Sequence, residues 1–337
     1  MFALSSVVAH IVGKYRIPSS VVFGCPKHVS YQNAGQLLEM AKSIIPPLTY
    51  DLHKGMMGKI GVVGGCKEYT GAPYFAAISS FKIGGDLLHV FCTGDSASVI
   101  KSYSPELIVH PILDSDTFMT QVDQWLPTLH AIVIGPGLGG SNVNLKNAES
   151  IIKMARKRDI PLVIDADGVN IIKENPEVIF EYTKAIITPN MAEFNRLFDK
   201  VMDGEKQNEN DPILNVKMLS KKLGNVTIVR KGENDIITNG KHVLVCGNEG
   251  SPRRCGGQGD VLAGTMGTMT HWSHTISQKG SSNNELFLAF GPTITAAYAA
   301  CLLTRQSNKQ AFAQFGRFMT ASDMIGQLPT AFEQLYL

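Results

Sequence analysis

The chain has 337 residues, 44% of them hydrophobic and 18% charged, which is ordinary for a folded globular protein and enough for one large core or two small ones. Its net charge of +2 points to neither a nucleic acid nor a membrane surface as a partner. No apolar run reaches the ~20 residues that cross a bilayer.

The first 38 residues are basic and free of acids. They contain Lys14, Arg16 and Lys27, and the first acid is Glu39. This bias is typical of a mitochondrial transit peptide, although an extension without a targeting function fits equally well. Mitochondrial and cytoplasmic localisation therefore both stay open. The remainder, 39–337, is expected to be a single domain because no linker separates its halves.

From residue 36 the pattern is that of an α/β protein. A short amphipathic helix is expected over 36–48, and strand-like apolar runs then alternate with helical stretches. The runs are Ile60–Val63, Leu87–Cys92, Ala131–Ile134, Leu162–Ile164, Ala185–Ile187 and Val226–Val229. This alternation predicts a mostly parallel sheet with helices on both faces. Ligands of such sheets bind beyond the carboxyl ends of the strands, so the loops after these runs are the expected site.

The second half adds a hairpin region and long helices. Val226–Arg230, Asp235–Thr238 and Val243–Cys246 predict an antiparallel meander. Helices are expected from Val261 onward, including Leu286–Leu303 and roughly Ser322–Tyr336. The polar segment Val201–Pro212 is expected to be a surface loop. The six cysteines, none in a Cys-x-x-Cys pair, indicate reduced thiols, with Cys92 and Cys301 in the core.

Two loops are rich in glycine. Gly64–Pro73 follows the first run and leads into a helix with Pro73 in its first turn, which is either a ligand loop or a plain connection. Gly135–Gly140 matches G-x-G-x-x-G, and Asp165 and Asp167 lie downstream as in a dinucleotide-binding fingerprint. Proline in the turn and the position in mid-chain count against a standard Rossmann domain.

Three further loops carry charge. Asp165 and Asp167 end a strand, where acids can hold Mg²⁺ or cap a helix, and Asp167 is the better helix cap. Asn190 and Glu193 fit a capping box, although Glu193 is also placed to organise magnesium-bound water. The turn at 231–235 either borders nucleotide phosphates or simply connects two strands. His271 and His274 are expected to mark a helix end.

The segment Gly250–Asp260 carries the strongest chemical signal. Four glycines and two arginines precede one acid, Asp260, and a helical run. Glycine lets backbone N–H groups approach an anion closely, and a helix N-terminus adds partial positive charge. A carboxylate at the same point can accept a proton from a hydroxyl. The combination suits phosphoryl transfer onto an alcohol.

Together these loops resemble the ATP-dependent NAD(P)H-hydrate dehydratases of the ribokinase-like superfamily. The resemblance covers about 54–332 and rests on motifs in the family's order: Gly64-Gly65 with Tyr69-Thr70-Gly71-Ala72-Pro73, Gly135-Pro136-Gly137-Leu138-Gly139, Asp165-Ala166-Asp167-Gly168, Thr188-Pro189-Asn190-x-x-Glu193-Phe194, Lys231-Gly232-x-x-Asp235 and Arg253–Asp260. It implies a three-layer α/β/α sandwich with a mostly parallel central sheet. It also implies that ATP phosphorylates the C6 hydroxyl of the S form of hydrated NADH or NADPH (NADHX or NADPHX), after which phosphate leaves.

Site roles follow from the resemblance, position by position. Asp260 is implied as the catalytic base and a contact to the hydrate, and Glu193 as the organiser of Mg²⁺ through water. The implied hydrate contacts are Gly139, Asn190, Met191, Ala192, Glu193, Phe194, Asn195 and Arg196. The implied ATP contacts are Lys231, Gly232, Glu233, Asn234, Asp235, Gly250, Ser251, Pro252, Arg253, Arg254, Cys255, Gly256, Gly257, Gln258 and Gly259.

Other functions stay open at this point. A vitamin-precursor kinase of the same superfamily would share the fold and Asp260, an NAD-dependent oxidoreductase would use the loop at 135–140, and a nucleotide sensor would bind without turnover. The resemblance implies a separate NAD(P)H-hydrate epimerase as functional partner, since too few residues precede the first motif for a fused one. A homo-oligomer also stays open.

Overall fold

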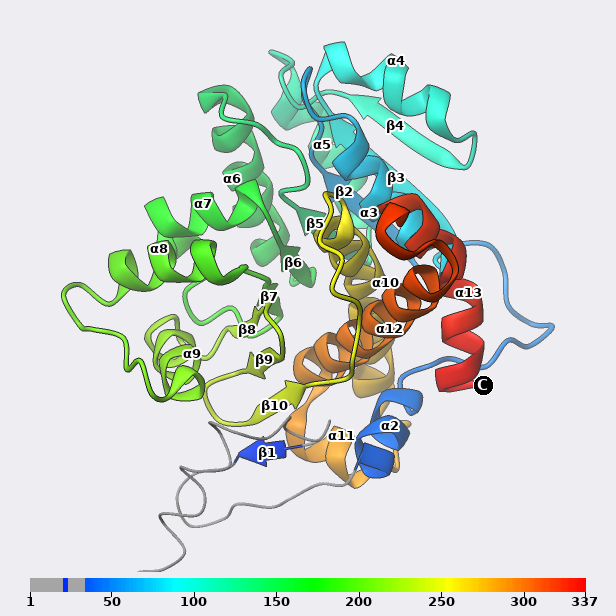
Figure 1. Cartoon of the computed structure of the whole chain (residues 1–337). Coiled ribbons are helices and arrows are strands. Elements are labelled where there is room, and N and C mark those ends of the chain that lie inside the picture. The colour runs from blue at the N-terminus through cyan, green and yellow to red at the C-terminus, as the bar shows by residue number, and fades with distance from the viewer. Residues whose placement is uncertain (1–20, 24–33) are drawn as a thin grey trace, which may run out of the picture.

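A ten-stranded sheet organises the molecule. The computed structural model describes residues 21–23 and 34–337. Within them the strand order is β1-β10-β9-β8-β7-β6-β5-β2-β3-β4 (Figure 1). The strands are β1 (Val21–Phe23), β2 (Lys59–Val63), β3 (Leu87–Cys92), β4 (Leu107–Pro111), β5 (Ala131–Ile134), β6 (Leu162–Ile164), β7 (Ala185–Ile187), β8 (Thr227–Arg230), β9 (Asp235–Thr238) and β10 (Val243–Cys246). Neighbours from β4 to β8 are parallel, and those from β8 to β1 are antiparallel.

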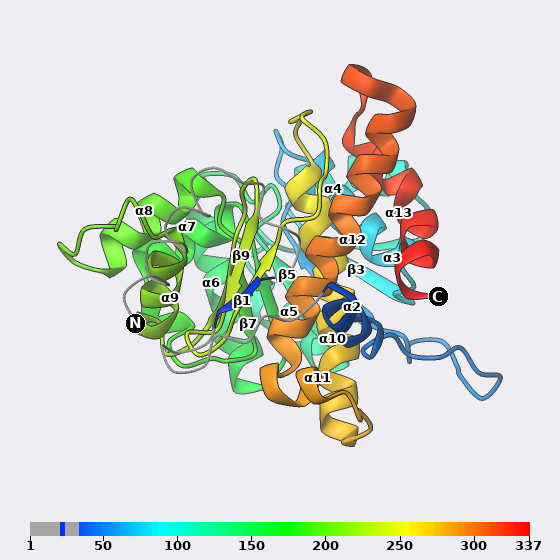
Figure 2. The same ribbon diagram turned by 60° about the horizontal axis from the view of Figure 1, so that its bottom comes forward.

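Helices cover both faces of the sheet. Side chains along each strand alternate between two hydrophobic clusters: in β5, Ala131 and Val133 join one cluster and Ile132 and Ile134 join the other. One face carries α2 (Ala34–Lys42), α3 (Gly71–Lys82), α4 (Gly94–Tyr103), α10 (Gln258–Lys279), α11 (Glu285–Phe290), α12 (Pro292–Phe315) and α13 (Ala321–Tyr336). The other carries α5 (Phe118–Trp125), α6 (Asn142–Lys157), α7 (Asp167–Glu174), α8 (Met191–Val201) and α9 (Pro212–Lys222) (Figure 2). The α/β/α sandwich expected from the sequence is confirmed.

The predicted strands are largely correct, because each is a short, fully buried apolar run. The meander is confirmed as β8–β9–β10. The strand β4 was not predicted, since Leu107–Pro111 at the sheet edge alternates with exposed residues and contains a histidine and a proline.

Three helix predictions are wrong. The helix expected over 286–303 is two helices, because the chain turns at Gly291, where φ is +83°, and Pro292 starts α12. The first helix ends at Lys42 rather than at 48. His271 and His274 do not mark a helix end; both are buried within α10, which continues to Lys279.

The described part of the N-terminal segment is folded onto the domain. The backbone of β1 pairs with β10, and the predicted boundary between 38 and 39 falls inside α2, whose Leu37 is buried. The transit-peptide prediction rests mostly on 1–20 and 24–33, which lie outside the described residues. None of the helices in the described part of the chain is long and apolar enough to cross a membrane. The five cysteines in that part are free thiols, and Cys92 and Cys301 are buried as predicted.

Candidate active site

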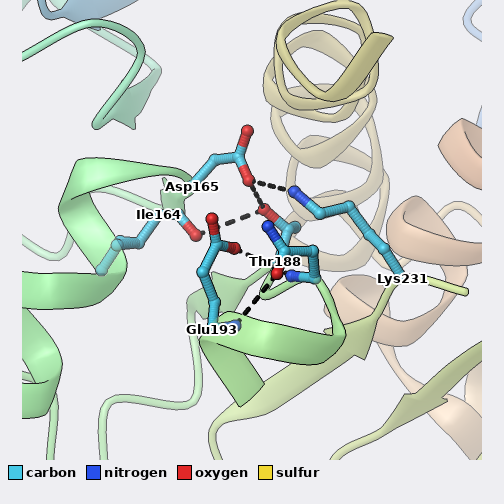
Figure 3. Close-up of polar contacts among 6 residues, drawn as sticks. Ile164, Asp165, Thr188, Glu193 and Lys231 are labelled. Carbon is cyan, nitrogen blue, oxygen red and sulfur yellow. Dashed lines mark hydrogen bonds and ion pairs between the residues drawn. The ribbon is translucent and has the colours of Figure 1, made fainter. Parts of the chain in front are cut away.

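Three polar side chains meet where β6, β7 and β8 end. Asp165, Thr188 and Lys231 each follow one of these parallel strands, so the sheet delivers them to the same edge. Asp165 Oδ1 accepts hydrogen bonds from Lys231 Nζ at 2.5 Å and from Thr188 Oγ1 at 2.8 Å (Figure 3). The N–H of Lys231 donates to the carbonyl of Pro189 at 2.9 Å, which holds the β7 and β8 loops together.

The ion pair between Asp165 and Lys231 is shielded from water. The side chain of Asp165 is 2% exposed and that of Lys231 is 20% exposed. Burial alone would lower the pKa of Lys231, but Asp165, Glu193 and Asp260 outweigh it and hold that pKa above its ordinary value. Lys231 is therefore a fixed cation among three carboxyl groups.

Asp260 lies in the first turn of α10, beside this ion pair. A methyl group on the adjacent Gly259 would lie 3.5 Å from Lys231 Nζ and 3.6 Å from Asp165 Oδ2. Burial, with repulsion from Asp165, raises the pKa of Asp260 to about 8, even though Lys231 opposes the rise. A carboxyl group with such a pKa can take a proton from a hydroxyl near neutral pH.

The glycine-rich segment before α10 is held by its own polar contacts. Arg254 Nη1 donates to the carbonyl of Ser251, and Gln258 Nε2 donates to the carbonyl of Arg253 at 3.2 Å. Gly257 caps α10 with φ +91° and, being glycine, contributes no side-chain cap to the first N–H groups of the helix. The Asp260 carboxyl accepts from its own backbone N–H, and the N–H groups at the start of α10 still present partial positive charge to an anion.

A second arginine ties the predicted ATP segment at 231–235 to Asn248, two residues before the predicted segment that begins at Gly250. Arg305 of α12 donates to Asp235 Oδ2 at 2.7 Å, to the carbonyl of Gly232 at 2.9 Å and to the carbonyl of Asn248 at 3.0 Å. The other carboxylate oxygen of Asp235 accepts from the N–H of Gly232. The carboxylate of Asp235 is thus engaged within the protein. Sequence reasoning missed Arg305. A single basic residue directly after the mostly apolar segment Cys301–Thr304 could have indicated a buried arginine.

The start of α8 forms the predicted capping box. Asn190 Oδ1 accepts from the N–H of Glu193 at 2.9 Å, and Glu193 Oε2 accepts from the N–H of Asn190 at 2.8 Å. Burial raises the pKa of Glu193, and Lys231 opposes this. Within the predicted substrate segment, Met191, Ala192, Asn195 and Arg196 are exposed. The side chain of Phe194 is instead fully buried against Phe198, so it serves packing.

The glycine loop after β5 packs against the Asp165 loop, and the glycine loop after β2 packs against the loop after β5. A methyl group on Gly135 would lie 1.7 Å from the carbonyl of Asp165, and one on Gly64 would lie 1.9 Å from that of Pro136. These close backbone approaches account for both glycines without a dinucleotide.

The helix cap predicted for Asp167 is wrong. The N-cap of α7 is Ala166, held at φ +48°, and Asp167 is the first helical residue. Asp167 Oδ2 accepts from the N–H of Gly139 at 2.9 Å instead, because the turn at Ala166 points this carboxylate toward the loop after β5. The turn therefore links Gly139, a predicted hydrate contact, to the loop that carries Asp165.

No protein-only metal site is apparent in the described ranges, since no three or more His, Cys, Asp or Glu side chains there are grouped to hold an ion. Mg²⁺ commonly uses one or two carboxylates and completes its octahedron with water and substrate phosphates. The half-buried Glu193, with one oxygen in the capping box and its carboxylate within electrostatic range of Asp165, fits that pattern.

The chain is similar to known proteins over most of its length. A family model described as NAD(P)H-hydrate dehydratase matches residues 60–330. The chain is 50% identical over 314 residues to the ATP-dependent (S)-NAD(P)H-hydrate dehydratase of Homo sapiens, covering 93% of this chain and 88% of that protein. It is 48% identical to the protein of the same name from Danio rerio, covering 95% of each.

Solved structures share the fold. The Bacillus subtilis ADP/ATP-dependent NAD(P)H-hydrate dehydratase co-crystallised with ATP/Mg²⁺ superposes with a TM-score of 0.64 at 18% identity, covering 88% of this chain and 97% of that one. A ribokinase-like superfamily protein from Enterococcus faecalis gives a TM-score of 0.70 at 21% identity, covering 88% and 94%.

Proposed function

The chain belongs to the NAD(P)H-hydrate dehydratase family, and on that premise we propose how its residues carry out the reaction. It is an ATP-dependent lyase that dehydrates (S)-NADHX or (S)-NADPHX to the reduced dinucleotide, with release of ADP and phosphate. Hydroxide is a poor leaving group and phosphate a good one, so phosphorylation at C6 makes the elimination feasible.

Asp260 is the base that takes the proton of the C6 hydroxyl. The observation that carries this assignment is its position in the first turn of α10, next to Gly259 and the Asp165–Lys231 pair, with its pKa raised to about 8. The hydroxyl oxygen then attacks the terminal phosphorus of ATP. Phosphate leaves C6 as the ring nitrogen donates its lone pair to form an iminium. Loss of a proton from C5 to water or to the departing phosphate then forms the C5=C6 double bond and returns the lone pair to nitrogen.

The ATP phosphates lie against the start of α10. The uncapped N–H groups of that helix and the backbone of Gly250–Gly259 supply donors, and Lys231 supplies a fixed positive charge. Arg305 holds the turn at Gly232–Asp235 in register with Asn248, so the second ATP segment keeps its place while nucleotide exchanges. The hydrate then lies toward Gly139 and the exposed face of α8.

Mg²⁺ accompanies ATP in this proposal. Bound with the nucleotide, the ion would neutralise charge on the phosphates. Glu193 would help to hold it through water, using the carboxylate oxygen outside its capping box. The family membership further supports a separate NAD(P)H-hydrate epimerase as the functional partner that supplies the S form.

A direct assay tests this function. Prepared hydrate, ATP and Mg²⁺ should give reduced-nicotinamide absorbance together with one inorganic phosphate per turnover. A small-molecule kinase of the same superfamily would leave the phosphate on its product, and an oxidoreductase would need no ATP. Turnover without ATP, or a stable phosphorylated product, would contradict the assignment.

The rate should depend on the ionisation of Asp260. A base works only when deprotonated, and burial and Asp165 raise the pKa of Asp260 to about 8. We expect kcat/KM for the hydrate to fall about tenfold per pH unit below that pKa and to level off above it. The measurement is kcat/KM at saturating ATP from pH 6 to 9.5. A profile already flat at pH 6 would show that another group is the base.

The glycine-rich segment offers a clean test of ATP binding. A methyl group on Gly256 meets no atom within 4 Å, whereas one on Gly257 would lie 2.6 Å from Ala321 Cβ and at a positive φ. Gly256→Val should therefore keep the fold and raise the Kd for ATP about tenfold or more by crowding the phosphates. Calorimetric titration with ATP measures the affinity. Gly257→Val, in contrast, should also lower the melting temperature, and an unchanged ATP affinity in both variants would remove this segment from the site.

A further inference from the structure

A pocket opens beside the predicted hydrate segment 190–196. It has a volume of about 720 Å³ and lies between α8, the segment that joins α8 to α9, and the end of β8. Met191 and Asn195, two of the predicted hydrate contacts, line it together with Arg230 and Lys206. The pocket therefore continues the substrate surface of α8 away from the catalytic cluster.

The wall of this pocket is built by side-chain amides. Gln207 Nε2 donates to Asn195 Oδ1 at 3.2 Å, which fastens the segment to α8. Asn215 of α9 accepts from the N–H of Asn208 at 2.8 Å and donates to the carbonyl of Asn208 at 2.9 Å. The segment between the two helices is thus held in place from both sides.

Arg230 is a cation without an anion. Its guanidinium carbon lies 5.8 Å from the centre of the Phe194 ring, and its Nε is buried without a hydrogen-bond partner. Burial lowers the pKa of Arg230, and none of the ion pairs found in the described part of the chain includes it. A partly buried, unpaired guanidinium is costly unless a ligand supplies the negative charge.

The acids around the pocket do not fill that role. Asp199, Glu205 and Glu209 also line it, but all three are exposed at its rim, where water screens their charge. Arg230 is the half-buried charge in the wall, and Lys206 adds a second positive charge at the rim. A planar guanidinium fork matches the oxygens of a phosphate.

The place of the pocket in the fold indicates which phosphate it receives. In both views the segment joining α8 and α9 lies on the side of the molecule away from α10, which carries Asp260 (Figures 1 and 2). The hydrated ring must meet Asp260, so only the far, adenosine end of the dinucleotide extends to this side. The phosphate that distinguishes NADPHX from NADHX is at that end, on the adenosine ribose.

We propose that Arg230, assisted by Lys206, binds the 2′-phosphate of NADPHX and makes this pocket the subsite that selects the phosphorylated substrate. The proposal rests on the proposed function, since it places the hydrate over the exposed face of α8. Arg230 is a specificity-determining residue here, because its guanidinium lies over the Phe194 ring and not in the Asp165–Lys231 cluster.

Arg230→Gln tests the proposal in the full-length protein. kcat/KM for NADPHX should fall about 10–100-fold while kcat/KM for NADHX changes less than about threefold, because only one substrate loses a charge-assisted contact. Arg230→Lys should restore part of the NADPHX activity. Lys200→Gln, on the exposed surface of α8 but outside the pocket, removes the same charge and should leave the ratio of the two activities unchanged.

Two outcomes overturn the proposal. An equal loss for both substrates would show that Arg230 holds the shared pyrophosphate or supports Phe194, and an unchanged ratio would show that it contacts neither phosphate. A parallel titration with NADPH and NADH, which lack the hydroxyl, is independent of turnover. If the wild-type protein turned over neither hydrate, the proposed function would fail. A binding preference for NADPH over NADH that Arg230→Gln abolishes would still support the subsite. If the variant kept that preference, the subsite would be excluded.

Discussion

Replacing Asp260 with asparagine should lower kcat for the hydrate by about 10²–10⁴-fold and leave the Kd for ATP within a few-fold. The amide keeps the size and hydrogen-bonding shape of the side chain but cannot accept the hydroxyl proton. In the proposed site the ATP contacts come from backbone N–H groups and from Lys231, whose positive charge Asp165 and Glu193 still support in the variant. Single-turnover rates and calorimetric titration with ATP separate the two effects.

The same variant should be more stable than the wild-type protein at alkaline pH. The pKa of Asp260 is raised in the folded state from 3.8 to about 8, so the folded state binds this proton more tightly than the unfolded state does. Ionisation of Asp260 therefore lowers the free energy of unfolding increasingly as the pH rises above 3.8, and this loss of stability reaches its full size above about pH 8. Asparagine removes it, and we expect the melting temperature at pH 8.5 to rise by about 2–6 °C, with no gain below pH 4.

A matched variant controls for the loss of a helix-terminal acid. Asp95 is an exposed acid in the first turn of α4, remote from the cluster in sequence and environment. Asp95→Asn should keep full activity and show none of the alkaline stabilisation. An active Asp260→Asn variant would remove this residue from the mechanism, and an inactive variant with a lowered melting temperature would point to a structural role instead.

Lys231→Met should lower the free energy of unfolding by about 3–5 kcal/mol and shift the pH–rate profile toward higher pH. The substitution leaves the carboxylate of Asp165, 2% exposed, with Thr188 as its remaining polar partner in the cluster. Lys231 also lowers the pKa of Asp260, so its loss should move the rise in kcat/KM to a higher pH. Urea unfolding at pH 7.5 and kcat/KM between pH 7 and 10 measure the two effects.

A double substitution and an exposed pair complete this test. Asp165→Asn combined with Lys231→Met removes both charges, so most of the stability should return while activity stays low. Lys184→Met breaks an ion pair with Asp159, which is 69% exposed, and should cost less than about 1 kcal/mol. Equal costs at Lys231 and Lys184 would contradict the burial argument.

Local pattern was enough to predict the sheet and most helix starts. Ala131–Ile134 and Leu162–Ile164 are buried strands because each is a short apolar run that ends at a turn-forming residue. The capping box at Asn190 and Glu193 depends on residues three positions apart, so it is visible in sequence. Helix 286–303 was mispredicted because its apolar pattern continues across Gly291, whose positive φ breaks the helix.

By itself the sequence determined the order of the elements and the presence of a glycine-rich anion loop beside Asp260, because these depend on neighbouring residues. Only the tertiary structure decided that Asp165 pairs with Lys231, that Arg305 joins two loops, that Asp167 serves Gly139 rather than a helix cap, and that Arg230 is left without an anion. These partners lie between 28 and 73 positions apart where they are paired. Parallel strands bring the loops that carry Gly139, Asp165 and Lys231 to one edge of the sheet, whereas Arg305 reaches its partners from α12. The sequence does not indicate which distant residue a charged side chain pairs with, or that it has no partner, because tertiary packing decides both.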